Sequence, residues 1–463
     1  MIRLIVKKEI RSGMLSLRFG LTFALMVALF AANGAIFTGI YEEGIRSYRE
    51  AINKATEDLR EACKELSGMS LHRQSHLLPP KVTAFVCEGF EKYLPNTVRV
   101  NAFRTFDPVG GRQGNFLYPR FADLDWTFIV GVVLSLAVLL LTYDGVCGER
   151  EDGTLRLAAS YPVSRSTLIL GKYLGTMAVV SAAFLLGVLI DLAIVNTGPL
   201  IRLDAGGWLR VGLGLGASLA FLSCFALLGL AVSALVRQSS TSLVSLLFLW
   251  VAFCLLIPNV AGMLAGKIDP IPKRMAVNEQ VSRARQDAVR NAPDGTWNYN
   301  SGNPFMPNHE LRADAVTKQL VAEMKIRNDY WNQSVRQAER ARGIARLSPA
   351  GAYTYLCEAV SGTGMNRLIA LRRDLRIYKD ILHQFVRERD ADDPKSPHWI
   401  NPTHGLFFSK KPVAFEEAPQ YGSSESALGQ SLNAALWDLG ILGIFNGLLF
   451  AIAYIAFVRY DVR

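Results

Sequence analysis

A dense charged segment lies between two apolar stretches of this 463-residue chain. Its sequence is Gly148-Glu149-Arg150-Glu151-Asp152-Gly153-Thr154-Leu155. Side chains of both signs at this density can form ion pairs across a protein interface. Gly153 allows a tight turn, and Thr154 can cap a helix that starts near Leu155. We interpret the segment as a docking element for another protein.

The residues after this segment return the chain to an apolar stretch. Pro162 breaks the short helix, and Ser164 is placed to cap the next one. An alternative role for the charges is to anchor a turn at the lipid headgroups. The acidic residues Glu149, Glu151 and Asp152 do not attract anionic lipid, which favours docking.

Motifs for catalysis are absent from the sequence. There is no glycine-rich loop ending in Gly-Lys-Ser/Thr for nucleotide phosphates, no His-Glu-x-x-His, no Gly-x-Ser-x-Gly and no Cys-x-x-Cys. The net charge is +10, but no basic stripe with interleaved aromatic residues appears, so we expect no nucleic-acid partner. We therefore expect a chain without enzyme activity, resident cofactor or metal.

The composition predicts a membrane protein. Half of the residues are hydrophobic and 19% are charged, so apolar and polar segments must alternate. A helix needs roughly 20 apolar residues to cross the hydrocarbon core. The first apolar run is too long for a cleaved signal core, so we expect it to be retained. Six spans are predicted, at 20–41, 126–146, 168–196, 208–236, 242–264 and 434–458.

Basic residues near the span ends predict the orientation, because they concentrate on the cytoplasmic side. This places both termini in the cytoplasm of a bacterium, with the protein in the inner membrane. An amphipathic helix at 1–19 should lie on the inner leaflet. The predicted cytoplasmic segments are 1–19, 147–167 and 459–463, and the predicted extracytoplasmic regions are 42–125 and 265–433.

The two long extracytoplasmic regions carry helical patterns. Apolar residues recur at three-and-four spacing from Ile45 to Leu66, from Val316 to Val335 and from Leu368 to Phe385. These stripes either pack on one another or form an open groove for a partner. The predicted fold is an all-α polytopic membrane protein with about six transmembrane helices. Its helical extracytoplasmic domain is built from two long loops.

Cysteines and buried polar residues leave alternatives open. Cys63 and Cys87 could form a disulfide bridge in an oxidising compartment, or remain free thiols packed as small apolar groups. Asn33, Asp191 and Asn446 lie in predicted spans, where polar groups often mark a transport pathway. Asp191 could instead lie at the interface, bonded to a neighbouring helix.

The charged segment, Tyr161-Pro162-Val163-Ser164-Arg165 and Leu170-Gly171-Lys172-Tyr173 resemble the permease subunit of a type-2 ABC exporter. The stretch from Leu347-Ser348-Pro349 to Ser361-Gly362-Thr363-Gly364, and the C-terminal Phe457-Val458-Arg459-Tyr460-Asp461-Val462-Arg463, resemble the branch with a large outer insertion between the fifth and sixth spans. The resemblance covers the whole chain.

The resemblance implies that the charged segment is a coupling helix for a separate ATPase subunit, which would bind ATP and Mg²⁺. It also implies a second permease, either an identical copy or a similar chain. The residues implied in coupling are Glu149, Arg150, Glu151, Asp152, Gly153, Thr154, Leu155, Pro162, Arg165 and Lys172.

Two functions fit this sequence. The first is ATP-driven export of a substrate across or out of the membrane. The second is mechanical transmission without transport, in which ATPase motion reaches an extracytoplasmic protein through the outer helices. The sequence does not identify the substrate.

Overall fold

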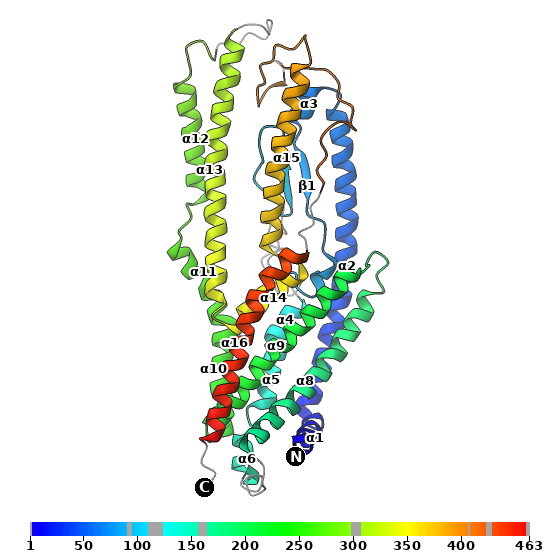
Figure 1. Cartoon of the computed structure of the whole chain (residues 1–463), viewed down its shortest axis with the longest axis vertical. Coiled ribbons are helices and arrows are strands. Elements are labelled where there is room, and N and C mark those ends of the chain that lie inside the picture. Colours follow the sequence, from blue (N-terminus) through cyan, green and yellow to red (C-terminus); the bar gives the residue numbers. More distant parts are fainter. Residues whose placement is uncertain are drawn as a thin grey trace.

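Six long helices and an outer helical part make up the fold (Figure 1). The computed structural model describes residues 2–89, 95–109, 124–155, 164–297, 307–405, 408–422 and 428–459. Among these residues, six helices are long and apolar enough to cross a membrane, which confirms the predicted all-α polytopic class. They are α2 (Leu17–Ala62), α4 to α6 (Trp126–Glu151), α8 (Arg165–Val195), α9 (Ala205–Leu235), α10 to α11 (Ser239–Ile268) and α16 (Leu428–Val458).

The N-terminal segment forms the helix α1 (Ile2–Met14), as its pattern predicted. It packs against α8, and glycines on α8 permit the close approach. A Cβ atom added at Gly175 would lie only 2.4 Å from the Cβ of Glu9. Ser16 then caps α2 by accepting a hydrogen bond of 3.2 Å from the backbone of Phe19. One face of α1 is therefore occupied by protein.

Helix α2 is much longer than a membrane span. Its 46 residues extend about 70 Å at the rise of an α-helix, whereas the hydrocarbon core is about 30 Å thick. The helix thus runs without interruption from the end that carries α1 into the outer part (Figure 1).

The second and fifth spans each contain a π-helical segment, η3 (Ile129–Leu134) and η4 (Val251–Leu256). A π-helical turn leaves backbone carbonyls that need other partners in an apolar environment. Ser135 donates to the carbonyl of Gly131 at 2.7 Å, and Ser348 donates to the carbonyl of Phe253. These hydroxyls make the irregular turns tolerable inside the bundle.

A short helix from the large loop, α14 (Pro349–Ser361), joins the core formed by the spans. Its residue Tyr353 is fully buried and stacks on Phe221 of α9 with ring centroids 4.4 Å apart. The Tyr353 hydroxyl also shares a hydrogen bond of 2.9 Å with Ser218. The sequence pattern had given no sign that this part of 265–433 packs against membrane helices.

The outer part combines helices with a small antiparallel sheet, which the all-α prediction did not include. One buried apolar cluster contains Leu66, Val98, Leu320 and Leu375, so parts of the predicted stripes pack on one another and on the sheet. The elements are α3 (Leu66–Leu71), β1 (Gln74–Leu77), η1 (Val82–Phe85), β2 (Thr97–Val100), α12 (Arg274–Arg290), α13 (Pro307–Ala345) and α15 (Met365–Ala391).

The disulfide considered between Cys63 and Cys87 is not formed in the structure. Both thiols are free and buried. Cys63 belongs to the outer cluster, whereas Cys87 packs with Cys357 in the cluster that includes the spans. The two residues act as small apolar side chains, which was the other alternative.

The outer part contains a partly buried histidine that should make its stability depend on pH. His76 lies edge-to-face against Tyr378 and Tyr421, and burial lowers the pKa of His76 to about 4. The neutral imidazole is thus favoured in the folded state, so stability is lost as the pH falls from 6.5 toward 4.

We predict a loss of about 2 kcal/mol from this histidine between pH 7 and pH 5. Thermal unfolding of the purified protein at both pH values measures it. The variant His76→Phe should show a smaller pH dependence than the wild type, and an equal dependence would contradict the prediction.

Candidate functional site

The charged segment forms a protruding loop at the end of the molecule where both termini lie (Figure 1). We call residues 143–155 the α6 loop; it contains the helix α6 (Cys147–Glu151). Gly153 adopts a φ of +71°, which confirms the predicted turn. Ser164 caps α8 by accepting from the backbone of Thr167, also as predicted. Pro162 lies outside the described residues.

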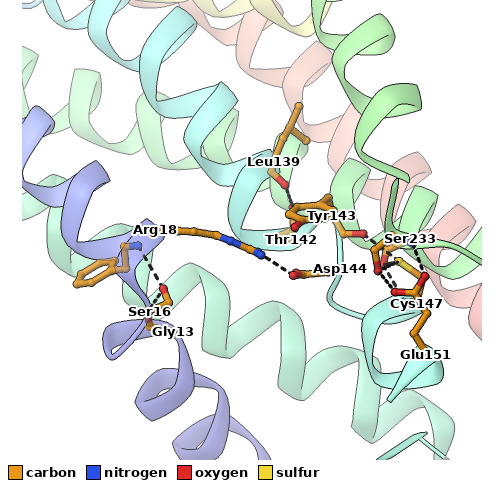
Figure 2. Close-up of polar contacts among 12 residues, drawn as sticks. Gly13, Ser16, Arg18, Leu139, Thr142, Tyr143, Asp144, Cys147, Glu151 and Ser233 are labelled. Carbon is orange, nitrogen blue, oxygen red and sulfur yellow. Dashed lines mark hydrogen bonds and ion pairs between the residues drawn. The ribbon is translucent and has the colours of Figure 1, made fainter. Parts of the chain in front are cut away.

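The α6 loop is attached to the fourth span by a serine hydroxyl (Figure 2). Helix α5 (Ser135–Thr142) ends before α6 begins, so backbone N–H groups at the break need acceptors. The N–H groups of Val146 and Cys147 donate to Ser233 Oγ at 3.0 and 3.1 Å. Ser233 is fully buried on α9. It serves as a cap supplied by a neighbouring helix.

A glycine allows α5 and α9 to approach each other beside this attachment. A Cβ atom added at Gly229 would lie 1.9 Å from Thr142 Oγ1, which is impossible without movement. The Thr142 hydroxyl donates to the carbonyl of Val138 at 2.8 Å and is itself buried. Close packing at Gly229 and the hydrogen bonds of Ser233 therefore both hold the break after α5 against α9.

Ion pairs connect the α6 loop to α1 and α8. Glu149 accepts from Lys8 at 2.8 Å and pairs with Lys172 at 2.9 Å. Lys172 also bonds Glu9 at 3.2 Å, and the Lys172 side chain is only 5% exposed. Such buried pairing is costly to break, because a remaining partner would be left uncompensated. Partial burial would lower the pKa of Lys8, but Glu149 raises it above its usual value.

Two further pairs join the α6 loop to α2 and α10. Arg18 donates to Asp144 at 2.7 Å and lies over the ring of Tyr143 (Figure 2). Glu151 accepts from both the backbone and the hydroxyl of Ser239, at 3.0 and 2.5 Å. Glu151 therefore caps the start of α10.

The remaining predicted coupling residues divide into buried and exposed groups. Leu155 is buried in an apolar cluster with residues of α8, α9 and α16. Arg165 donates to the carbonyl of Val458 at the end of α16. Asp152, Gly153 and Thr154 are exposed at the tip of the loop, and Arg150 is half-buried. The Thr154 hydroxyl donates to the carbonyl of Glu149 at 3.2 Å, so its observed bond closes the α6 turn.

Acidic residues of the α6 loop form contacts within the chain. The acidic residues Glu149 and Glu151 were expected to pair across an interface, yet both already have partners within the chain. No sequence pattern indicated the partners Lys8 of Glu149 and Ser239 of Glu151, because they lie on distant elements. The α6 loop is thereby tied to five helices: α1, α2, α8, α9 and α10.

The predicted pathway residues Asn33 and Asp191 lie together in the core. Asn33 donates to Asp191 at 3.0 Å and to the carbonyl of Phe85 at 3.3 Å. The indole of Trp126 also donates to Asp191. Asn33 and Asp191 are both fully buried. The cluster therefore joins α2, α4 and α8 to η1, through the carbonyl of Phe85.

Asn446 belongs to a second polar group, between α8, α9 and α16. Its amide donates to the carbonyls of Ala220 and Leu442, at 3.0 and 2.9 Å. Its oxygen accepts from Ser223 at 2.6 Å, and Ser223 bonds the Tyr173 hydroxyl at 2.7 Å. The arrangement satisfies polar groups between these three helices.

An apolar cavity of about 180 Å³ lies near this second group, between α9, α14, α16 and η4. Its walls are almost wholly hydrocarbon and include no charged side chain. It is lined by Cys224, Phe225, Leu228, Phe253, Pro349, Phe445, Leu448, Leu449 and Ile452.

Six hydrophobic spans, with a charged loop tied to their ends, define a polytopic membrane protein. The family model described as ABC-2 family transporter protein matches residues 3–462, and the chain belongs to that family. It is a permease subunit of an ABC transporter.

Two relatives are each described as a probable ABC transporter permease protein NosY. The protein from Pseudomonas aeruginosa is 36% identical over 135 residues, which are 28% of this chain and 47% of that protein. The protein from Stutzerimonas stutzeri is 42% identical over 55 residues, which are 12% of this chain and 20% of that protein. This chain thus matches less than half of either relative's length.

The contact between α5 and α9 gives a test of how the α6 loop is held. We predict that Gly229→Ala lowers stability by about 1–3 kcal/mol, because the new methyl group overlaps Thr142. Gly212→Ala on the same helix is the matched control, since no atom lies within 4 Å of its added Cβ. Thermal unfolding in detergent micelles compares them. Equal effects of the two substitutions would contradict the proposed close packing.

Proposed function

We propose that this permease subunit couples ATP hydrolysis by a separate ATPase subunit to the export of a substrate. The proposal rests on two properties of the α6 loop, its contacts with several helices and its exposed tip. Its charged side chains contact α1, α2, α8 and α10, and its backbone is capped from α9, while Asp152 and Thr154 remain exposed at the tip. A partner that pushes on the tip would therefore move several spans together.

The nucleotide is assigned to the partner in this proposal. The sequence has no phosphate-binding loop of the Gly-Lys-Ser/Thr type, so ATP and Mg²⁺ would bind the ATPase subunit. The permease would then contribute no catalytic group, and its own role would be conformational.

The proposed location is the bacterial inner membrane with both termini in the cytoplasm. Both termini and the α6 loop lie at one end (Figure 1), and basic residues such as Lys7, Lys8 and Arg11 gather there. The outer helices would then be extracytoplasmic, with an outside protein as a further partner.

A second permease is part of the proposed assembly. Only 6% of the most apolar window of the fifth span is buried within this chain. Large side chains such as Phe248, Leu256 and Met263 are exposed on this helix. Either lipid or a partner protein can cover such a surface. The proposed partner is a second permease, which would be an identical or a similar chain.

Charge reversal at the tip tests the docking site. We predict that Asp152→Lys abolishes co-purification of the ATPase subunit without changing the thermal stability of the permease, because Asp152 is exposed. The matched control is Glu57→Lys, an exposed acidic residue on the outer half of α2. Mild detergent extraction followed by mass spectrometry measures the bound ATPase.

Glu151→Ala separates docking from transmission in the same experiment. Its carboxylate caps α10, so we expect the ATPase to remain bound but to hydrolyse ATP more slowly in the complex. Retention of the ATPase by Asp152→Lys at the wild-type level would refute the proposed contact.

A second candidate function is mechanical transmission to an outside protein, and the length of α2 favours it. The helix continues from the α1 end into the outer cluster, where Leu59 packs. Helix α13 is also anchored to the core. Arg342 pairs with Glu358 of α14 at 2.6 Å, and Arg346 pairs with the buried Asp438 of α16.

Breaking α2 outside the core tests this second function. We predict that Arg49→Pro removes nucleotide-dependent changes in hydrogen exchange of α15, because proline kinks a helix interior. Arg49→Ala is the control at the same exposed position. The ATPase complex is compared with and without a non-hydrolysable nucleotide. If α15 exchanges identically in both states of the wild type, no motion is transmitted.

A further inference from the structure

An excess of arginine gathers in the outer part, between α12, α13, α15 and the segment after β2. Two acidic residues neutralise part of it. Arg327 pairs with Asp107 at 2.7 Å and with Glu323 at 2.9 Å, and Arg285 pairs with Glu323 at 2.6 Å. These pairs use both carboxylates of the cluster.

Four more arginines stand around those pairs without an acidic partner among the described residues. Arg73 and Arg104 both lie over the ring of Phe106, at 4.8 and 4.3 Å from its centroid. Burial lowers the pKa of Arg104, and the positive charges of neighbouring arginines lower it further. The negative charge of Glu323 opposes this shift. The other two are Arg372 and Arg376 on α15.

Arg372 and Arg376 converge on one neutral atom. Both donate to the amide oxygen of Asn328, at 3.4 and 2.8 Å. Two guanidinium groups directed at one acceptor normally surround a carboxylate or phosphate, because those oxyanions match the guanidinium fork in charge and geometry. Here the shared acceptor carries no charge.

Arg372 shows most clearly that a partner is missing. The residue is 3% exposed, and its buried Nε atom has no hydrogen-bond partner. Its guanidinium carbon lies 4.3 Å from the ring centroid of Trp331, which provides a cation–π contact. Burial lowers the pKa of Arg372 to about 10, with Asp107 opposing this and Arg376 adding to it. A buried, weakly paired cation is unfavourable unless an anion joins it.

We propose that the outer part has an oxyanion-binding site between α13 and α15, at which Arg372 and Arg376 bind a carboxylate or phosphate group. Asn328 positions the two guanidinium groups, and Trp331 supports Arg372 from one side. The site is independent of the α6 loop and of the ATPase, and it would give the outer part a ligand of its own.

Calorimetric titration of the purified full chain in detergent micelles tests the site. The probes are inorganic phosphate and acetate, each compared with sodium chloride at equal ionic strength. Saturable binding of either oxyanion is expected, and the tighter of the two identifies the group. In Arg376→Gln the affinity should fall at least about tenfold. Arg283→Gln on α12 should bind normally, because Arg283 is exposed and pairs with Glu279 at the surface.

A second variant and a second measurement keep the test valid if one variant misfolds. Arg372→Gln should show the same loss, and if it fails to fold, the partly exposed Arg376 still gives the answer. Bound oxyanion should also raise the unfolding temperature of the wild type but not of Arg376→Gln. The proposal is overturned if neither probe binds up to about 10 mM, or if Arg376→Gln binds as the wild type does.

Discussion

Backbone amides and carbonyls buried among apolar side chains need hydrogen-bond partners, and this requirement organises the chain wherever its helices are irregular. The π-helical turns of the second and fifth spans are completed by Ser135 and Ser348. The break between α5 and α6 is completed by Ser233. In each case a single hydroxyl satisfies backbone groups where the chain departs from a straight α-helix.

The α6 loop depends on this requirement most directly. Because its backbone is capped from α9, the loop can leave the second span without fraying, and its charges are then available for ion pairs. Those charges reach α1, α2, α8 and α10. A loop with so many attachments is suited to transmit displacement, whereas a loop held only by its own helix would bend. The proposed coupling role rests on that mechanical difference.

The outer part follows a different principle, because its helices are rich in charged residues whereas the spans are apolar. Apolar residues of α3, β2, α13 and α15 share one buried cluster, and these helices carry charges on their other faces. Most of those charges are solvated or paired. The arginines of α15 that meet at Asn328 are exceptions, and their arrangement leads to the proposed oxyanion site. The membrane and outer parts are joined by α2, by α14 and by the ion pairs of Arg342 and Arg346.

The sequence by itself determined the spans, the outer helical stripes, the turn at Gly153 and the cap at Ser164. Each of these follows from local spacing or from the conformational preference of one residue type. Tertiary structure alone decided the partners of Glu149 and Glu151, the meeting of Asn33 with Asp191 and the burial of α14. These contacts join residues far apart in the chain, so no local pattern encodes them. The tertiary structure also left the two cysteines in separate clusters, although the sequence allowed a disulfide.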